Sequence, residues 1–143
     1  MNSVVVLQAR TNSSRLPGKV LLYVAGMPIV VLAAKRAGNT GRSVIVATSD
    51  QKTDDALAQV LTKFNVSCFR GDLDNTLSRI VLALENYPDD TKVFRLTADN
   101  VIPDGALLDE IERDFVEQNM DYLCCNGEQS GLPYGISVEL TKL

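Results

Sequence analysis

Three cations lie close together near the start of the chain, in the stretch VVVLQARTNSSRLPGK. Arg10, Arg15 and Lys19 follow an apolar run that is long enough for one buried strand. Short hydroxyl and amide side chains separate them, and a Pro-Gly pair signals a turn. Because arginine forks pair with phosphate oxygens and lysine supplies a compact charge, this loop suits a triphosphate. The alternative is a solvated loop with incidental charge, which is less expected in an acidic chain.

The size and charge of the chain limit what it can bind. Its 143 residues are enough for one domain with its own core, which we assign to residues 1–143. A net charge of −4 argues against general binding of nucleic acid or of anionic membranes, both of which favour a basic surface. The sequence shows neither an apolar run of about 20 residues nor a signal-peptide pattern, so we expect a cytoplasmic protein.

The absence of histidine restricts the chemistry further. No His-based triad, His metal site or His general base can form. The three cysteines have no CxxC spacing for zinc or redox work, and we predict buried free thiols. The reactive groups must therefore be carboxylates, lysine, arginine, hydroxyls or a metal held by carboxylates.

Strand and helix patterns alternate along the chain. Apolar runs predict strands at 4–7, 43–48, 66–69, 92–97, 121–125 and 136–140. Helical stripes predict helices at 29–37, from 53 to about 64, from about 76 until Pro88, and at about 104–118. This order is typical of an α/β fold with an open, mainly parallel sheet and helices on both faces. Since the chain ends without a closing helix, we expect a fragment or a short form.

Polar residues follow several of the predicted strands. They are Gln8 to Arg10, Thr48 to Asp50, Gly71-Asp72 and Asp99-Asn100. In an open parallel sheet, ligands bind beyond the carboxyl ends of the strands. We therefore expect all four groups to open on one edge and to form a site there.

Asp99 is the predicted metal ligand. Mg²⁺ takes one or two carboxylates and completes its shell with water and substrate phosphate oxygens, so an Asp that faces a polyphosphate suits it. The alternative is a turn or capping Asp, but Asp99 lies far from the helix start near Asp104. From composition alone, Arg79 is expected to be a solvated helix residue, and Asp72 to be a cap.

Five segments of the chain resemble one enzyme family. QARTNSSRLPGK, VIVATSD, CFRGDLDNTLSR, VFRLTADN and LPYGISVE are similar to successive motifs of the cytidylyltransferases that activate acidic sugars. The likeness is strongest to the spore-coat polysaccharide biosynthesis protein F type, relatives of the CMP-Kdo and CMP-N-acylneuraminate synthetases. It implies a nucleotide-diphospho-sugar transferase fold, which is Rossmann-like and of GT-A type.

The resemblance also implies roles for individual residues. Nucleotide binding would fall to Ala9, Arg10, Ser13, Arg15, Lys19 and Arg79, with Arg79 near the base. Asp99 would hold Mg²⁺ as the cofactor, and Gly135 and Glu139 would flank the sugar pocket. The implied reaction is attack of a sugar hydroxyl on CTP with release of pyrophosphate. Arg15, Lys19 and Asp99 would then be the catalytic residues.

Two alternatives remain beside this enzyme. The first is a shortened module that binds a nucleotide or nucleotide sugar without turnover, because the family chain is longer than this one and supplies further site residues. The second, a Rossmann-type oxidoreductase, is disfavoured because no GxGxxG follows the first strand. The resemblance leaves a homodimer open, since the family's dimer contacts come from the later part of its chain. Asn100-Val101 departs from the usual pair after the metal Asp.

Overall fold

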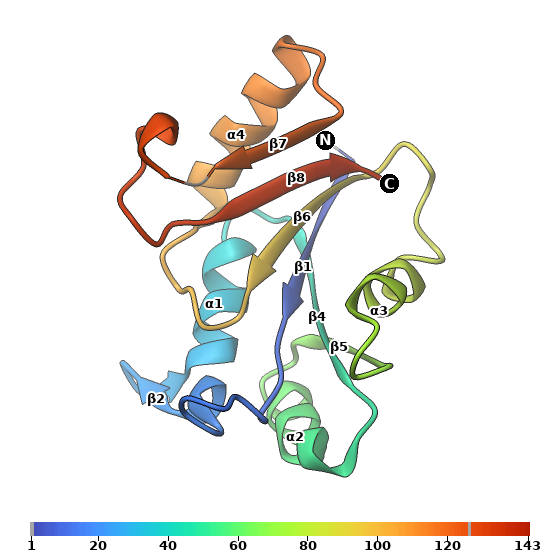
Figure 1. Ribbon diagram of the computed structural model, residues 1–143, viewed down its shortest axis with the longest axis vertical. Coiled ribbons are helices and arrows are strands. Elements are labelled where there is room, and N and C mark those ends of the chain that lie inside the picture. Colours follow the sequence, from blue (N-terminus) through green and yellow to red (C-terminus); the bar gives the residue numbers. More distant parts are fainter. Residues whose placement is uncertain (1, 126) are drawn as a thin grey trace.

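A six-stranded sheet forms the centre of the computed structural model, which describes residues 2–125 and 127–143 (Figure 1). The strand order is β5-β4-β1-β6-β8-β7. Four adjacent strands are parallel: β5 (Ser67–Gly71), β4 (Ser43–Ser49), β1 (Ser3–Gln8) and β6 (Lys92–Thr97). β8 (Val138–Lys142) runs antiparallel to both of its neighbours, β6 and β7 (Tyr122–Cys125). β2 (Tyr23–Val24) and β3 (Met27–Pro28) form a separate small hairpin.

Helices cover both faces of the sheet. α1 (Ile29–Ala37), α2 (Asp55–Lys63) and α4 (Gly105–Glu117) pack on one face, and α3 (Thr76–Ala83) packs on the other. Single 3-10 turns occur at Lys19–Leu21, Lys52–Asp54 and Glu128–Ser130. The predicted fold class, an open and mainly parallel sheet between helices, is confirmed. In the described part of the chain, no helix combines the length and the apolar character that a membrane crossing requires.

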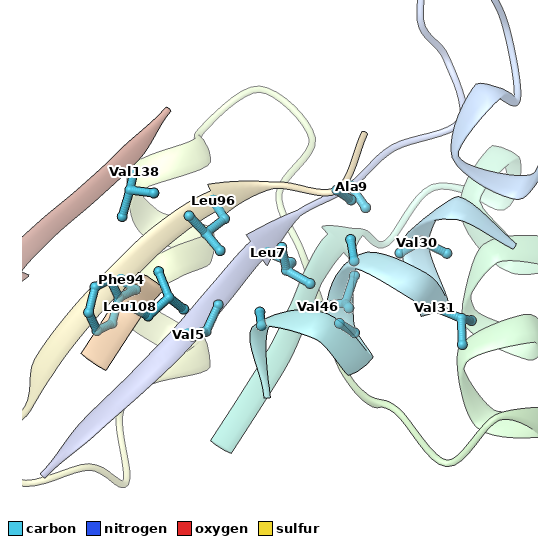
Figure 2. Close-up of a cluster of buried hydrophobic side chains, with 14 of the residues drawn as sticks. Val5, Leu7, Ala9, Val30, Val31, Val46, Phe94, Leu96, Leu108 and Val138 are labelled. Atoms are coloured by element: carbon cyan, nitrogen blue, oxygen red, sulfur yellow. The ribbon is translucent and has the colours of Figure 1, made fainter. Parts of the chain in front are cut away.

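The main core lies between the sheet and the three helices on its larger face. Leu7 of β1 is in register with Leu96 of β6 and with Val46 of β4, and all three are buried (Figure 2). Leu108 of α4 contributes to the same cluster. This continuous apolar layer is what parallel strands require, because they are buried on both faces. It holds the carboxyl ends of β1, β4 and β6 in fixed relative positions.

Local signals account for two helix starts. α1 begins directly after Pro28, whose fixed φ suits the entry into a helix. α4 is capped by Asp104, whose carboxylate accepts a hydrogen bond from the Leu107 amide at 3.1 Å. Asp104 is therefore the cap, as the sequence spacing indicated, and Asp99 is left for another role.

α3 differs in part from its predicted orientation. Its sequence predicts an apolar stripe of Leu77, Ile80, Val81 and Leu84. Ile80 and Leu84 do pack against the sheet, but Leu77 and Val81 are 72% and 52% exposed. Arg79, expected from composition to be solvated, is only 4% exposed. The helix is turned so that Arg79 and Leu84 face the sheet, because the Arg79 guanidinium finds hydrogen-bond acceptors there.

The cysteines are free, as predicted, but they are only partly buried. Cys125 packs against the main core cluster, whereas Cys124 is the preceding residue of β7 and therefore points to the other face.

Candidate active site

A cavity of about 360 Å³ opens at the carboxyl edge of β1 and β6. Its lining comes from the ends of these strands, from the loop after β1 and from α3: Gln8, Ala9, Arg10, Ser13, Ser14, Arg15, Lys19, Val20, Thr76, Arg79, Thr97 and Asp99. Four cations and one carboxylate are among these residues, so the cavity carries an excess of positive charge in a chain whose net charge is −4. Such a cavity favours an anionic ligand.

All six residues predicted to bind the nucleotide line this cavity, and so does Asp99. They come from three parts of the sequence: the loop after β1, α3 and the residues after β6. The parallel order of β1 and β6 brings the first and last of these parts to the same edge. The roles of the individual residues stay predictions, but their convergence is a property of the fold.

Lys19 and Asp99 form an ion pair on the wall of the cavity. Lys19 Nζ lies 2.5 Å from Asp99 Oδ2, and the two side chains are 27% and 40% exposed. Burial raises the pKa of Asp99, but the hydrogen bonds from Lys19 and Thr97 and the charge of Lys19 together outweigh this, and the net pKa is lowered. Asp99 is therefore ionised at neutral pH and able to bind a cation.

The loop after β1 is closed at its neck by backbone hydrogen bonds. The Gly18 amide donates to the Thr11 carbonyl oxygen at 2.8 Å, so the residues between them form a compact turn. Gly18 has φ +71°, in the left-handed region that favours glycine, and it leads into the 3-10 turn that begins at Lys19. The turn thus presents Ser13 and Arg15 on the side where Lys19 also lies.

Arg79 forms the inner wall on the α3 side. Its Nη1 donates to the carbonyl oxygens of Asp72 at 2.6 Å and of Leu73 at 3.1 Å. Burial lowers the pKa of Arg79, and the positive charge of Arg10 lowers it further. An arginine keeps its proton at neutral pH despite such a shift, so two guanidinium groups face the cavity together.

The two residues predicted to flank the sugar pocket lie outside this cavity. The Gly135 carbonyl oxygen accepts a hydrogen bond at 3.0 Å from Nδ2 of Asn100, the residue that follows the cavity-lining Asp99. Glu139 is on β8, where its carboxylate pairs with Arg95 at 2.6 Å. Arg95 also donates to Gln8 Oε1 at 2.6 Å, so a chain of polar contacts runs from Glu139 to the cavity wall.

Two strand ends expected to open on the site do not line the cavity. Asp50 is exposed and accepts a hydrogen bond from its neighbour Gln51. Asp72 accepts the amides of Asp74 and Asn75 and so closes its own turn, whereas the cap of α3 is Asn75 and not, as expected, Asp72. The predicted convergence of strand ends is therefore correct for β1 and β6 and wrong for β4 and β5.

The carboxylates near the cavity limit which metal it could hold. The described residues contain no cluster of three or more His, Cys, Asp or Glu side chains that could hold an ion. Asp99 is the single carboxylate among the cavity-lining residues described. One carboxylate beside a phosphate site fits Mg²⁺, which completes its shell with phosphate oxygens and water, and it would not suffice for a metal held by protein alone.

Some residues of the cavity wall were not predicted from the sequence. Thr76 and Thr97 line it from α3 and β6, and Asp54 supports it from behind through Thr11. Thr97 ends a predicted strand, so its position was accessible from the sequence. Asp54 lies at the start of a predicted helix. No local sequence pattern distinguishes an Asp that caps a helix from one that binds a distant loop.

Known proteins similar to this chain identify its family. The family model described as cytidylyltransferase matches residues 4–141. The chain belongs to the cytidylyltransferase family. The spore coat polysaccharide biosynthesis protein SpsF of Bacillus subtilis is 33% identical over 129 residues, which cover 85% of this chain and 53% of that protein. The 3-deoxy-manno-octulosonate cytidylyltransferase of Methylibium petroleiphilum is 33% identical over 124 residues, which cover 82% of this chain and 45% of that protein.

A solved structure gives the same result. A cytidylyltransferase from Leptospira borgpetersenii superposes with a TM-score of 0.85 at 28% identity, covering 99% of this chain and 60% of that one. The chain spans about half the length of the curated relatives that it matches. The resemblance recognised from the five sequence motifs is confirmed. Nearly the whole of this cytidylyltransferase chain superposes on part of the Leptospira structure.

Proposed function

We propose that this cytidylyltransferase chain binds CTP in the cavity at the carboxyl edge of β1 and β6 and transfers its cytidylyl group to a sugar. The main support for this proposal is that a single cavity is lined by four cations and one ionised carboxylate, which come from separate parts of the sequence. A cationic wall suits a triphosphate, and the carboxylate suits the metal that accompanies it. The relatives named for spore-coat polysaccharide and for 3-deoxy-manno-octulosonate support an acidic or related sugar in surface polysaccharide biosynthesis.

The chemistry proposed is a single in-line displacement. The oxygen of a sugar hydroxyl bonds to the α-phosphorus of CTP, and the bond from that phosphorus to the bridging oxygen breaks. Pyrophosphate leaves with the electron pair, and the hydroxyl proton passes to solvent. Such a reaction needs positioning and charge stabilisation more than it needs a nucleophilic side chain, so the absence of histidine is no obstacle.

The residues divide this work. Arg15 and Lys19 bind the phosphates and stabilise the charge on the departing pyrophosphate. Arg79 and Ala9 lie on the nucleoside side of the cavity. Asp99 would hold Mg²⁺, which supplies charge neutralisation at the phosphate oxygens when bound. Gly135 and Glu139 would contact the sugar. Gly135 is hydrogen-bonded to Asn100, which follows the cavity-lining Asp99. Glu139 pairs with Arg95, which donates to the cavity-lining Gln8.

Pyrophosphate release tests the proposal. The protein is incubated with CTP, Mg²⁺ and acidic sugars that include 3-deoxy-manno-octulosonate. We expect release that falls about 10- to 100-fold in Lys19→Ala and in Asp99→Asn, since each removes one charged contact. Lys142→Ala and Asp121→Asn are matched controls, because these two side chains form a 2.6 Å ion pair outside the cavity. They should leave release unchanged.

The outcome also separates the enzyme from the binding module. CTP binding without pyrophosphate release, with any acidic sugar, would favour the shortened module. Absence of CTP binding in the presence of Mg²⁺ would contradict both functions.

A further inference from the structure

Asp54 is a buried carboxylate that the proposed reaction does not use. It lies at the end of the 3-10 turn before α2 and has no exposed surface. Its Oδ1 accepts the Thr11 amide at 2.8 Å and lies 2.7 Å from the Thr11 hydroxyl oxygen. Its Oδ2 accepts the Ser49 amide at 3.3 Å and the Ser49 hydroxyl. A buried carboxylate is tolerated only with such partners, so this arrangement is specific.

The position of Asp54 in the sequence is that of a helix cap, but its side chain does not cap. It stands at the N-cap of α2, and it makes no hydrogen bond to the first turn of that helix. Asp is a favoured capping residue because its oxygen accepts the amides of the first turn. Here both oxygens are turned toward β4 and the loop after β1 instead. The side chain therefore gives up a local contact for one that spans 43 residues.

Thr11 is the partner that matters for the site. Its amide and hydroxyl are held by Asp54, and its carbonyl oxygen accepts the Gly18 amide at 2.8 Å. Thr11 and Gly18 therefore close the base, or neck, of the loop that carries Ser13 and Arg15, both of which line the cavity. The Thr11 hydroxyl oxygen lies 2.7 Å from both Asp54 Oδ1 and the Thr53 carbonyl oxygen, and its single proton is donated to one of these two acceptors at a time.

The charge state of Asp54 suits a carboxylate that accepts several hydrogen bonds. Burial raises its pKa, but hydrogen bonds from Ser49 and Thr11 outweigh burial, and the net pKa is lowered. The carboxylate is therefore ionised at neutral pH, and both of its oxygens can accept hydrogen bonds, which a neutral acid cannot offer to the same extent.

We propose that Asp54 is a positioning residue, which fixes Thr11 so that the loop from Thr11 to Gly18 is preorganised for the nucleotide phosphates. It touches neither the nucleotide nor the sugar, and it acts through the neck of the loop. A loop ordered before binding loses less conformational freedom when the phosphates arrive, so the affinity for the nucleotide is higher. The expected effect of Asp54 on CTP affinity rests on the proposed function. The expected effect of Asp54 on the order of the loop does not.

The test compares Asp54→Asn with Glu112→Gln, two nearly isosteric replacements of buried carboxylates. Glu112 also has no exposed surface, and it accepts Ser3 Oγ and Arg42 Nη2, each at 2.8 Å, near the amino ends of β1 and β4. Both variants should lower the urea midpoint. Two measurements then follow: hydrogen exchange of the amides from Thr11 to Gly18 without nucleotide, and the Kd of CTP with Mg²⁺.

We expect Asp54→Asn alone to accelerate exchange in the loop and to raise the Kd about tenfold. Thr11→Ser keeps both donors and should behave as the unaltered protein does. Equal effects of Asp54→Asn and Glu112→Gln on exchange and affinity would show a merely structural role and overturn the inference. Unchanged loop exchange in Asp54→Asn would overturn it as well. If the unaltered protein binds no CTP while Asp54→Asn still loosens the loop, the proposed function fails and the positioning role stands.

Discussion

Replacement of Asp99 by Asn should change nucleotide affinity in opposite directions with and without Mg²⁺. In the structure the Asp99 carboxylate lies 2.5 Å from Lys19 Nζ. Without metal, this carboxylate repels the phosphates of CTP and keeps Lys19 engaged. With metal, the same carboxylate becomes a ligand that holds the cation against the phosphates.

The size of each effect follows from the exposure of the pair. Because the Lys19 and Asp99 side chains are 27% and 40% exposed, their attraction is that of a surface pair, about 0.2–1 kcal/mol. Freeing Lys19 by Asp99→Asn should therefore strengthen metal-free CTP binding by about 1.4- to 5-fold. With Mg²⁺, loss of a direct ligand should weaken binding by about tenfold or more, since even indirect partners of a metal cost 10- to 100-fold.

Calorimetric titration with CTP, once in chelator and once in excess Mg²⁺, measures both values. Asp121→Asn is the matched control, because Asp121 pairs with Lys142 at 2.6 Å outside the cavity, and it should change neither affinity. Weakening by the same factor under both conditions would refute the metal role of Asp99. It would show instead that the carboxylate only orders Lys19.

Further outcomes follow from the packing and from the charges. Arg79→Met leaves the carbonyl oxygens of Asp72 and Leu73 without their donor, so the free energy of unfolding should fall by about 1–3 kcal/mol in urea titration, and CTP should bind more weakly. Leu108→Ala removes a fully buried side chain and should cost about 2–5 kcal/mol in the same assay without altering the Kd of CTP; a change in that Kd would contradict the separation of core and site. The lowered pKa of Asp54, where hydrogen bonds outweigh burial, stabilises the fold above the ordinary Asp value of about 3.9. That contribution is lost as the pH falls through the lowered value, so Asp54→Asn should flatten the acid limb of the stability curve, and an unchanged limb would refute the assignment.

The position of the cationic loop could be predicted from the residues that follow β1. Arg10, Arg15 and Lys19 follow a buried strand directly, and the strand positions fix the edge of the sheet at which they lie. The same argument placed Asp99 at that edge, and the two groups do meet. These predictions succeeded because the positions of the strands follow from apolar periodicity, which is local information, and because the carboxyl ends of parallel strands meet at one edge of a sheet.

The failures concern residues whose partners are far away in the sequence. The stripe of α3 pointed Leu77 inward and Arg79 outward, whereas the fold does the reverse, because carbonyl oxygens of the preceding turn make a buried guanidinium acceptable. The strand ends at Asp50 and Asp72 had the right residue types, but their own turns use them.

The sequence by itself determined the α/β order, the cationic loop and the carboxylate that faces it, since residue type and spacing carry that information. Only the tertiary structure decided which polar side chains share one cavity and which support it. Asp54 is the clearest case: its sequence context is that of a helix cap, and its partner Thr11 is 43 residues away. A hydrogen bond over such a distance depends on the packing of β1 against β4, and no local pattern encodes it.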